Sequence, residues 1–182
     1  MKKNLLLLSI LAFVLFSCGG LDTSDSSSDS DNDSDEIVYT TDDAIEYNDE
    51  MIDIQSEVDQ SLVDMLDVLD YGTAEDMWEA KEETLELIDE SIEKVEEMDE
   101  FDGSDEFKDE MLELLDMYKD IVENELTIVI EYQIDFDNLS DDEFDEYYDL
   151  YTVALDKYES AFSNFTEFQE DFAEEWDFSL EY

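Results

Sequence analysis

The amino-acid sequence predicts an all-α protein, an up-down-up-down antiparallel four-helix bundle that follows a disordered acidic tether. Apolar residues recur every three or four positions in four long segments, as they do on the buried face of a helix. Short stretches that favour turns or helix caps separate these segments. Four helical segments of roughly 27 to 36 residues with short connections are typical of an up-down bundle.

The first predicted helix covers residues 41–71. Its apolar seam steps by four and three positions, which is a heptad pattern. The seam consists of Ala44, Asn48, Met51, Gln55, Val58, Leu62, Met65 and Leu69. Asn48 and Gln55 are polar members of this seam, and they either fix the register of the helices or line a polar pocket. A second row, Ile45, Ile52 and Leu66, widens the seam to a core-facing stripe. Acidic residues fill most of the remaining positions and are expected to face solvent.

The second predicted helix begins after Thr73 and ends at about residue 99. Gly72 stands where a left-handed C-cap of the first helix is favoured. Thr73 is the expected N-cap, and the acidic residues after it suit the positive end of the helix dipole. The apolar residues of this helix form two adjacent rows: Met77, Thr84, Ile88, Val95 and Met98, and Trp78, Leu85 and Ile92.

The third predicted helix covers residues 105–133 and follows a break at residues 102–104. Ser104 is its expected N-cap. Its apolar stripe consists of Phe107, Met111, Leu114, Leu115, Tyr118, Ile121, Val122, Leu126 and Val129. Residues 127–130 are all β-branched and suit a short strand, but the sequence offers no partner strand, so we expect them to be helical.

The fourth predicted helix starts at a capping box formed by Ser140 and Glu143 and runs to about residue 176. Aromatic residues dominate its stripe, which consists of Phe144, Tyr148, Tyr151, Leu155, Tyr158, Phe162, Phe165, Phe168 or Gln169, Phe172 and Trp176. We interpret this stripe either as the core of the bundle, with tyrosine hydroxyls at its rim, or as a surface on which a ligand stacks.

The charge of the chain is strongly acidic, with 59 Asp and Glu residues against 7 basic residues and a formal net charge of −52. This charge excludes nucleic acid as a partner, because phosphate binding needs clustered cations. Direct adhesion to anionic lipid headgroups is excluded for the same reason. The acidic residues either keep a surface protein soluble or indicate a saline habitat, and mutual repulsion is expected to raise many carboxyl pKa values.

The residue types that are absent exclude most catalytic sites. The chain has no His or Arg and only one Cys, so it lacks a Ser-His-Asp or Cys-His relay, a His or Cys zinc site and an arginine clamp. The alternating acidic residues from Asp29 do not form an EF-hand loop, because Ser34 and Thr40 stand where Gly and Glu are required. We therefore expect no enzyme, no cofactor and no catalytic, cofactor-binding or metal-binding residue.

The first 17 residues have the pattern of a cleaved secretory signal peptide. A short positive start precedes an apolar run that is too short to span a membrane. The run ends in Leu15, Phe16, Ser17 and Cys18, and this ending resembles the box of bacterial lipoprotein signals, which is an aliphatic residue, a small residue and a cysteine. The resemblance implies cleavage before Cys18, lipid such as palmitate on its thiol and amine, and a lipid anchor in a membrane.

Residues 18–36 contain the lipidated cysteine and a linker of Gly, Ser, Asp, Asn and Thr that we expect to be disordered. We interpret the linker either as a solvated spacer or as a localisation signal. An acidic run after the lipidated cysteine resembles the surface-export signal of Bacteroidetes lipoproteins. Gly19 rather than Asp follows Cys18, so the common inner-membrane retention signal is absent. These features favour a lipid-anchored protein in the outer membrane, at the cell surface.

Residues 37–182 form the predicted bundle domain. A family resemblance depends on residues 43–48, 102–109, 118–126 and 168–173, with the tail 178–180. In these stretches the domain resembles a family of uncharacterised small helical surface lipoproteins of Bacteroidetes and spirochaetes. The resemblance implies a location and a shape, and no reaction. We therefore expect a monomeric, non-enzymatic interaction or structural module with an unknown protein or cation partner. The alternative is a cation- or small-ligand-binding accessory lipoprotein of a transport system.

Overall fold

The computed structural model describes residues 38–180, and these residues confirm the predicted all-α class. They contain no β-strand, and four long helical segments pack against one another. Cys18, the predicted signal peptide (1–17) and the predicted linker (18–36) lie outside the described residues. The elements are α1 (Thr41–Tyr71), α2 (Ala74–Glu97), α3 (Glu106–Ile121), η1 (Val122–Leu126), α4 (Thr127–Ile134), η2 (Phe136–Asn138) and α5 (Asp141–Glu175).

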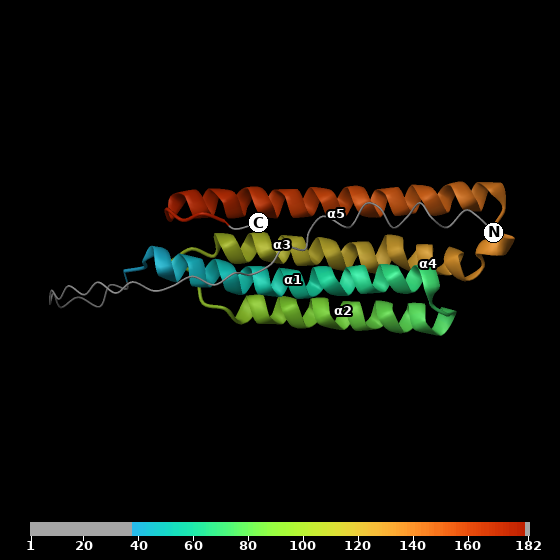
Figure 1. Ribbon diagram of the computed structural model, residues 1–182, viewed down its shortest axis with the longest axis horizontal. Helices are drawn as coiled ribbons and strands as arrows, with labels where there is room; N and C mark the ends of the chain where they lie inside the picture. Colours follow the sequence, from blue (N-terminus) through green and yellow to red (C-terminus); the bar gives the residue numbers. More distant parts are fainter. Residues whose placement is uncertain (1–37, 181–182) are drawn as a thin grey trace.

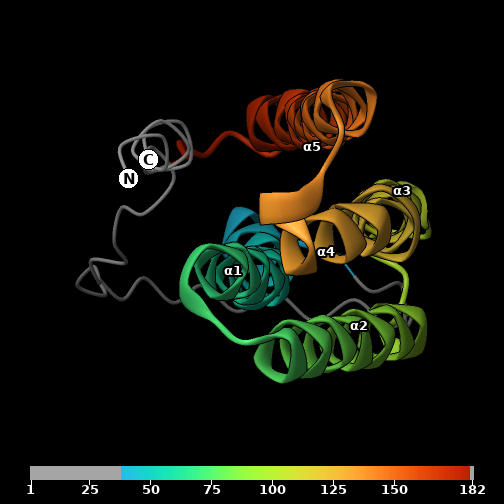
Figure 2. The same ribbon diagram turned by 90° about the vertical axis from the view of Figure 1, so that its right-hand side faces the viewer.

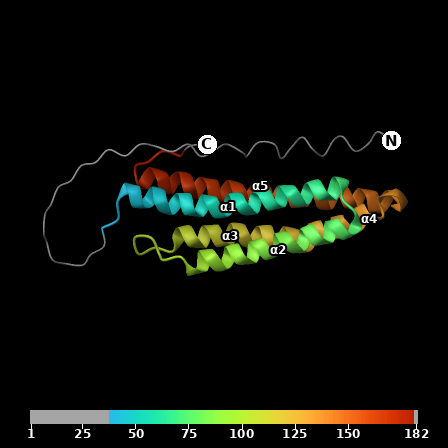
Figure 3. The same ribbon diagram turned by 60° about the horizontal axis from the view of Figure 1, so that its bottom comes forward.

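The helices lie side by side along the long axis of the molecule (Figure 1). In the end-on view, α1 and the α3–α4 segment lie between α5 on one side and α2 on the other (Figure 2). Among the long helices, the most extensive backbone contacts join α1 to α2, α2 to α3, and α3 to α5. α1 also lies beside α5 (Figure 3), but these two backbones come close at only a few positions.

Capping boxes begin three of the helices. The pairs are Thr40 and Asp43 in α1, Thr73 and Asp76 in α2, and Ser140 and Glu143 in α5. In each pair the hydroxyl accepts a hydrogen bond from the backbone N–H of the acidic residue, and the carboxylate accepts one from the N–H of the cap. These hydrogen bonds lower the pKa of all three carboxyl groups, because they stabilise the charged form.

The two glycine-containing junctions differ from the sequence prediction in their details. Gly72 is not left-handed, because its φ is −80°. A Cβ at this position would lie 2.6 Å from the carbonyl oxygen of Val68, so the glycine is needed for close approach. The left-handed conformation occurs at Asp102 and Gly103 instead. Ser104 is not the N-cap of α3, but its hydroxyl accepts a hydrogen bond from the Glu106 N–H at 3.2 Å.

A single π-helical turn, η1, interrupts the predicted third helix. The Thr127 hydroxyl donates to the Val122 carbonyl oxygen at 2.9 Å across this turn. The β-branched residues 127–130 are helical, as predicted. Because a π turn inserts extra residues into the helical repeat, it rotates the face that α4 presents relative to α3. Such turns often occur at functional sites, and this one lies against α5.

Aromatic rings fill the core near the start of α1. Phe107 is only 4% exposed, and its ring centroid lies 4.7 Å from that of Phe172 and 5.3 Å from that of Phe168. Phe101 contacts Phe172 and Trp176 at 5.6 and 5.1 Å. The aromatic stripe of the fourth predicted helix therefore packs in the core over this half of α5. A second, smaller cluster at the other end consists of Leu69, Met77, Val129, Ile130 and Tyr147.

The first half of α5 presents a different face to the core from the predicted one. Tyr147 is buried at 4% exposure, whereas the predicted stripe residue Tyr148 is 41% exposed. Ala154 is buried, and the neighbouring stripe residue Leu155 is only partly buried. Aromatic and aliphatic residues stand at adjacent positions here, so the sequence pattern does not distinguish one helical face from the next.

Substitution of Phe107 by Ala tests the aromatic cluster. We expect Phe107→Ala to lower the free energy of unfolding by about 3–5 kcal/mol, because the ring is buried among other rings that cannot fully close the cavity. Urea denaturation measures the change. Tyr71→Ala is the control, because Tyr71 is 78% exposed and its loss should change stability by less than about 0.5 kcal/mol. A loss below about 1 kcal/mol for Phe107→Ala would contradict this account of the core.

Candidate functional site

Two polar residues of the α1 seam lie inside the bundle. Asn48 and Gln55 are 5% and 6% exposed. The Gln169 side-chain amide of α5 donates a hydrogen bond to Asn48 Oδ1 at 2.9 Å. This bond joins two helices whose backbones are mostly well separated, and it satisfies buried polar atoms that would otherwise be costly. For Asn48, the geometry favours the prediction of a register-setting residue.

A partly buried carboxyl group, that of Asp59 on α1, forms the centre of a second polar cluster. The Tyr158 hydroxyl of α5 donates to Asp59 Oδ1 at 3.2 Å. Tyr118 of α3 stacks on Tyr158 with ring centroids 5.1 Å apart and an interplanar angle of 11°. Tyr118 is fully buried, and its hydroxyl lies near Asp59 without a hydrogen bond of regular geometry in the described part of the chain. One carboxyl group and two phenols thus connect three helices.

Burial dominates the electrostatics of this cluster. It raises the pKa of Asp59 to about 6, although interactions with Tyr118, Tyr158 and Gln55 act in the opposite direction. The pKa of Tyr118 and that of Tyr158 are also raised, first by burial and then by the negative charge of Asp59. Asp59 can therefore gain or lose a proton near pH 6, while both tyrosines remain neutral hydrogen-bond donors.

The chemistry available to Asp59 is limited by its surroundings. A carboxyl group with a raised pKa beside a phenol is a possible general acid. The two hollows described on the surface do not include Asp59 among their lining residues. Neither of these two hollows therefore brings a substrate-sized space to the Asp59 carboxyl group. Its clearest consequence is for the stability of the bundle.

Sequence reasoning did not identify Asp59, because acidic residues occupy most positions outside the two predicted rows of α1. Asp59 continues the second row, seven positions after Ile52 and seven before Leu66, but an acidic residue there is not distinguished from its solvent-facing neighbours by the sequence. Its partner Tyr158 is on the predicted aromatic stripe. Their pairing depends on the rotation of α5 about its axis, which no local pattern specifies.

A charged cluster joins α5 to the π turn. The Lys157 ammonium group donates to Asp120 Oδ2 at 2.6 Å and to Glu125 Oε1 at 2.9 Å. These bonds raise the pKa of Lys157. The second carboxylate oxygen of Glu125 is buried and has no hydrogen-bond partner in residues 38–180. The π turn places Glu125 within reach of Lys157 and thereby ties the third helical segment to α5.

Lys157 also lies at one edge of a groove between α3 and α5, which we call the α3–α5 groove. The groove has a volume of about 350 Å³, within the roughly 300–1,000 Å³ range of ligand clefts. Its apolar lining, which we call the floor, consists of Leu114, Met117, Val153, Ala161 and Phe165, and its acidic lining, which we call the rim, consists of Glu110, Glu113 and Asp156. The neutral polar residues Ser160 and Asn164 complete the lining.

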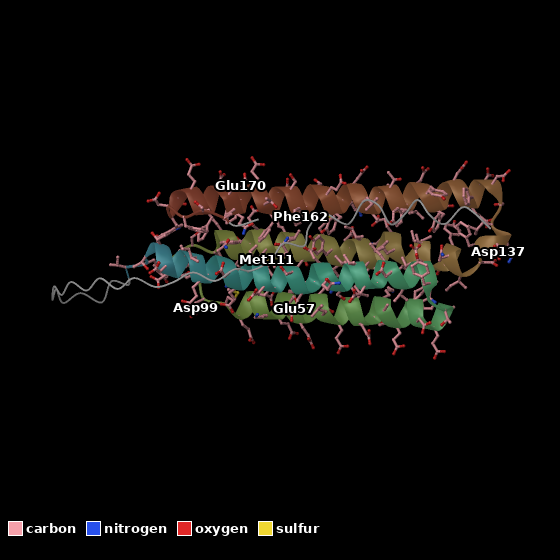
Figure 4. The ribbon with its side chains drawn as sticks, in the orientation of Figure 1. Glu57, Asp99, Met111, Asp137, Phe162 and Glu170 are labelled. Atoms are coloured by element: carbon pink, nitrogen blue, oxygen red, sulfur yellow. The ribbon has the colours of Figure 1, made fainter. Side chains whose placement is uncertain are left out.

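The outer surface carries most of the carboxylates. Figure 4 shows oxygen-tipped side chains projecting outward along α5 and α2. Four of the five lysines in residues 38–180 form ion pairs: Lys81, Lys108, Lys119 and Lys157. Among the same residues, no group of three or more acidic side chains is arranged to hold a metal ion. None of the described helices combines the length and hydrophobicity that a membrane span requires.

The pKa of Asp59 predicts how stability depends on pH. Its pKa is higher in the folded state than the ordinary value of 3.8, so the folded state binds more protons between these two values and stability falls as pH rises from about 4 to about 6. At neutral pH the ionised Asp59 carboxylate then lowers the free energy of unfolding by on the order of 3 kcal/mol. We expect Asp59→Asn, which keeps an acceptor for Tyr158, to raise the free energy of unfolding by about 1–3 kcal/mol at pH 7.5.

Urea denaturation of both proteins should show this gain falling below about 1 kcal/mol at pH 4, where the unfolded-state carboxyl group also begins to protonate. Asp53→Asn is the matched control, because Asp53 is an exposed carboxylate on the same helix and the charge change is identical. An equal gain from the two variants would attribute the effect to general surface repulsion. That result would contradict a specific role of Asp59.

Comparisons with known proteins identify no relative of this chain. No protein-family model, no curated protein sequence and no solved structure matches it. A functional assignment therefore depends on the residues of the chain and their geometry.

Proposed function

We propose that this protein is a bacterial lipoprotein that is anchored in the outer membrane by lipid on Cys18 and acts at the cell surface as a non-enzymatic interaction module. The observation that carries the proposal is the contrast between a filled interior and an acidic exterior. The main core cluster contains residues of α1, α2, α3 and α5 along their length. Because the protein's own side chains fill the bundle, its outer surface is the part available to partners.

We further propose that the bundle has an up-down-up-down antiparallel topology. This topology is supported by the positions of the connections in Figure 1, where the α1–α2 turn and the α4–α5 connection lie at one end of the molecule. The α2–α3 connection lies at the other end. Short connections between neighbouring helices are typical of such bundles, and the resemblance to small helical surface lipoproteins implies the same shape.

The described residues begin at one end of the bundle, and this position agrees with anchoring through that end. The start of α1 lies at the same end of the bundle as the α2–α3 connection (Figure 1). A tether that joins here holds the bundle by one tip. The sides of the bundle, including the α3–α5 groove, then remain accessible to other molecules.

A second candidate function is that of an accessory lipoprotein that binds a cation or a small ligand for a transport system. The α3–α5 groove favours it, because a partly enclosed groove with an apolar floor and carboxylates at the rim is a plausible ligand site. Both functions place recognition at the surface of the bundle rather than in its interior.

The lipid anchor is tested by substitution of Cys18. We expect Cys18→Ser to move the protein from the membrane fraction to the soluble fraction, because it removes the thiol that would be acylated. Ser17→Ala is the control, since it keeps a small residue before the cleavage site and should leave the protein in the membrane. Mass spectrometry of the mature protein should find an acylated amino-terminal cysteine.

Protease treatment of intact cells then tests surface exposure. The protein should be degraded without lysis if it is displayed at the surface. Persistence of the protein until lysis would contradict display, whereas a free thiol at Cys18 would contradict the anchor itself.

A further inference from the structure

We propose that the α3–α5 groove binds a basic amphipathic helix of a partner protein, with apolar anchors on the groove floor and cationic side chains at its acidic rim. This inference rests on the proposed role as an interaction module and identifies the class of partner. Its support comes from the apolar floor, the unpaired charge of the rim and the backbone of the groove walls.

The bundle leaves part of the apolar floor of the groove exposed, at Met117, Val153 and Ala161. Leu114 and Phe165 also line the groove, but they belong to the core and are almost fully covered, at 2% and 1% exposure. Met117 and Ala161 are partly buried beside them. Val153 is 43% exposed at the edge. Methionine suits such a surface, because its flexible side chain adapts to the shape of an incoming apolar group.

The rim carries negative charge that no lysine of residues 38–180 neutralises. Glu110 and Glu113 on α3 and Asp156 on α5 form no ion pair within this range. The cation at the groove, Lys157, is already bound to carboxylates outside it. The pKa of Glu110 is raised by burial, and then by the charges of Glu113 and Asp109. A cationic side chain at this position would relieve that repulsion.

The walls of the groove limit how a peptide can bind. Both walls are helices whose backbone N–H and C=O groups are paired internally, so an added β-strand finds no main-chain partners here. Recognition must use side chains, as when a helix docks in a groove. The α5 wall extends from Val153 to Phe165, which is about 18 Å at a rise of about 1.5 Å per residue. Three turns of helix match this length and present anchors at positions i, i+4 and i+7.

The chemistry of the groove also argues against other occupants. An anionic ligand would be repelled by the rim. A bare metal ion gains nothing from an apolar floor, and no metal-binding group of three acidic residues occurs among the described residues. The partner therefore needs both an apolar face and positive charge, which a basic amphipathic helix combines.

The test is isothermal titration calorimetry of the full chain in neutral detergent micelles. The probe is a synthetic peptide of about four helical turns, with leucines on one face and lysines beside them. We expect one peptide per chain to bind at about 0.15 M NaCl, where long-range attraction is largely screened. A scrambled peptide of the same composition is the first control. Equal binding of the scrambled peptide would overturn the proposal, because it would reflect charge alone.

Variants of the chain test whether binding occurs in the groove. The triple variant Glu110→Gln, Glu113→Gln and Asp156→Asn should weaken binding by about tenfold or more, because it removes the acidic rim. The matched control is Glu46→Gln, Glu50→Gln and Asp53→Asn, which removes the same charges from a hollow lined by α1 residues and Lys94. It should weaken binding by less than about threefold. Equal losses in both triple variants would overturn the proposal.

Two substitutions of the groove residues test the apolar contacts. Ala161→Phe should block the floor and weaken binding by about tenfold, and Val153→Ser should weaken it by about threefold. Because Val153 is exposed, the serine variant should fold normally, which circular dichroism checks. Unchanged affinity in both variants would overturn the proposal, since the peptide would not contact the floor.

Spermidine distinguishes a partner helix from a small polycation. If spermidine bound more tightly than the peptide and lost affinity in the rim and floor variants alike, the groove would be a small-cation site and the helix proposal would be wrong. The result is independent of the Cys18 test, because binding in micelles does not require the lipid anchor and membrane fractionation does not require the groove.

Discussion

The burial of apolar side chains between four helices must outweigh the mutual repulsion of an acidic surface, and the rest of the structure depends on this balance. The chain has no disulfide partner for its single cysteine, and few lysines to neutralise 59 acidic residues. Stability must therefore come from the core. Large rings such as those of Phe107, Phe165 and Phe172 supply apolar area at one end of the bundle.

Within this balance, the location of a carboxyl group decides whether it stabilises or destabilises the fold. At the helix starts, Asp43, Asp76 and Glu143 have lowered pKa values, so their ionised forms favour folding. Asp59, Asp70 and Glu110 have raised pKa values, mainly because burial disfavours charge. At these six positions, local hydrogen bonds or burial are the largest cause of the shift in carboxyl pKa.

The features that could be predicted from the sequence are those that depend on near neighbours in the chain. Helical periodicity located α1, α2 and α5, and the Ser140 capping box lies where the sequence places it. The missed features depend on packing between segments. Tyr147 rather than Tyr148 lies in the core, and Tyr158 contacts Asp59, because of how α5 is rotated about its axis. The π turn sets the rotation of α4 relative to α3. The α3–α5 groove was missed because it exists only where two helices meet.

The lack of histidine gives the raised carboxyl pKa values a further consequence. Side chains that ordinarily titrate near pH 6 are absent, so a response to mild acid falls to Asp59, whose pKa is raised to about 6. Protonation of Asp59 removes a partly buried charge and stabilises the bundle. The pKa of Glu110 is also raised, and its protonation reduces the negative charge of the proposed groove site and weakens the attraction for cations there. Acid therefore favours the folded bundle and opposes the proposed binding, because both carboxyl groups are partly buried in an acidic protein.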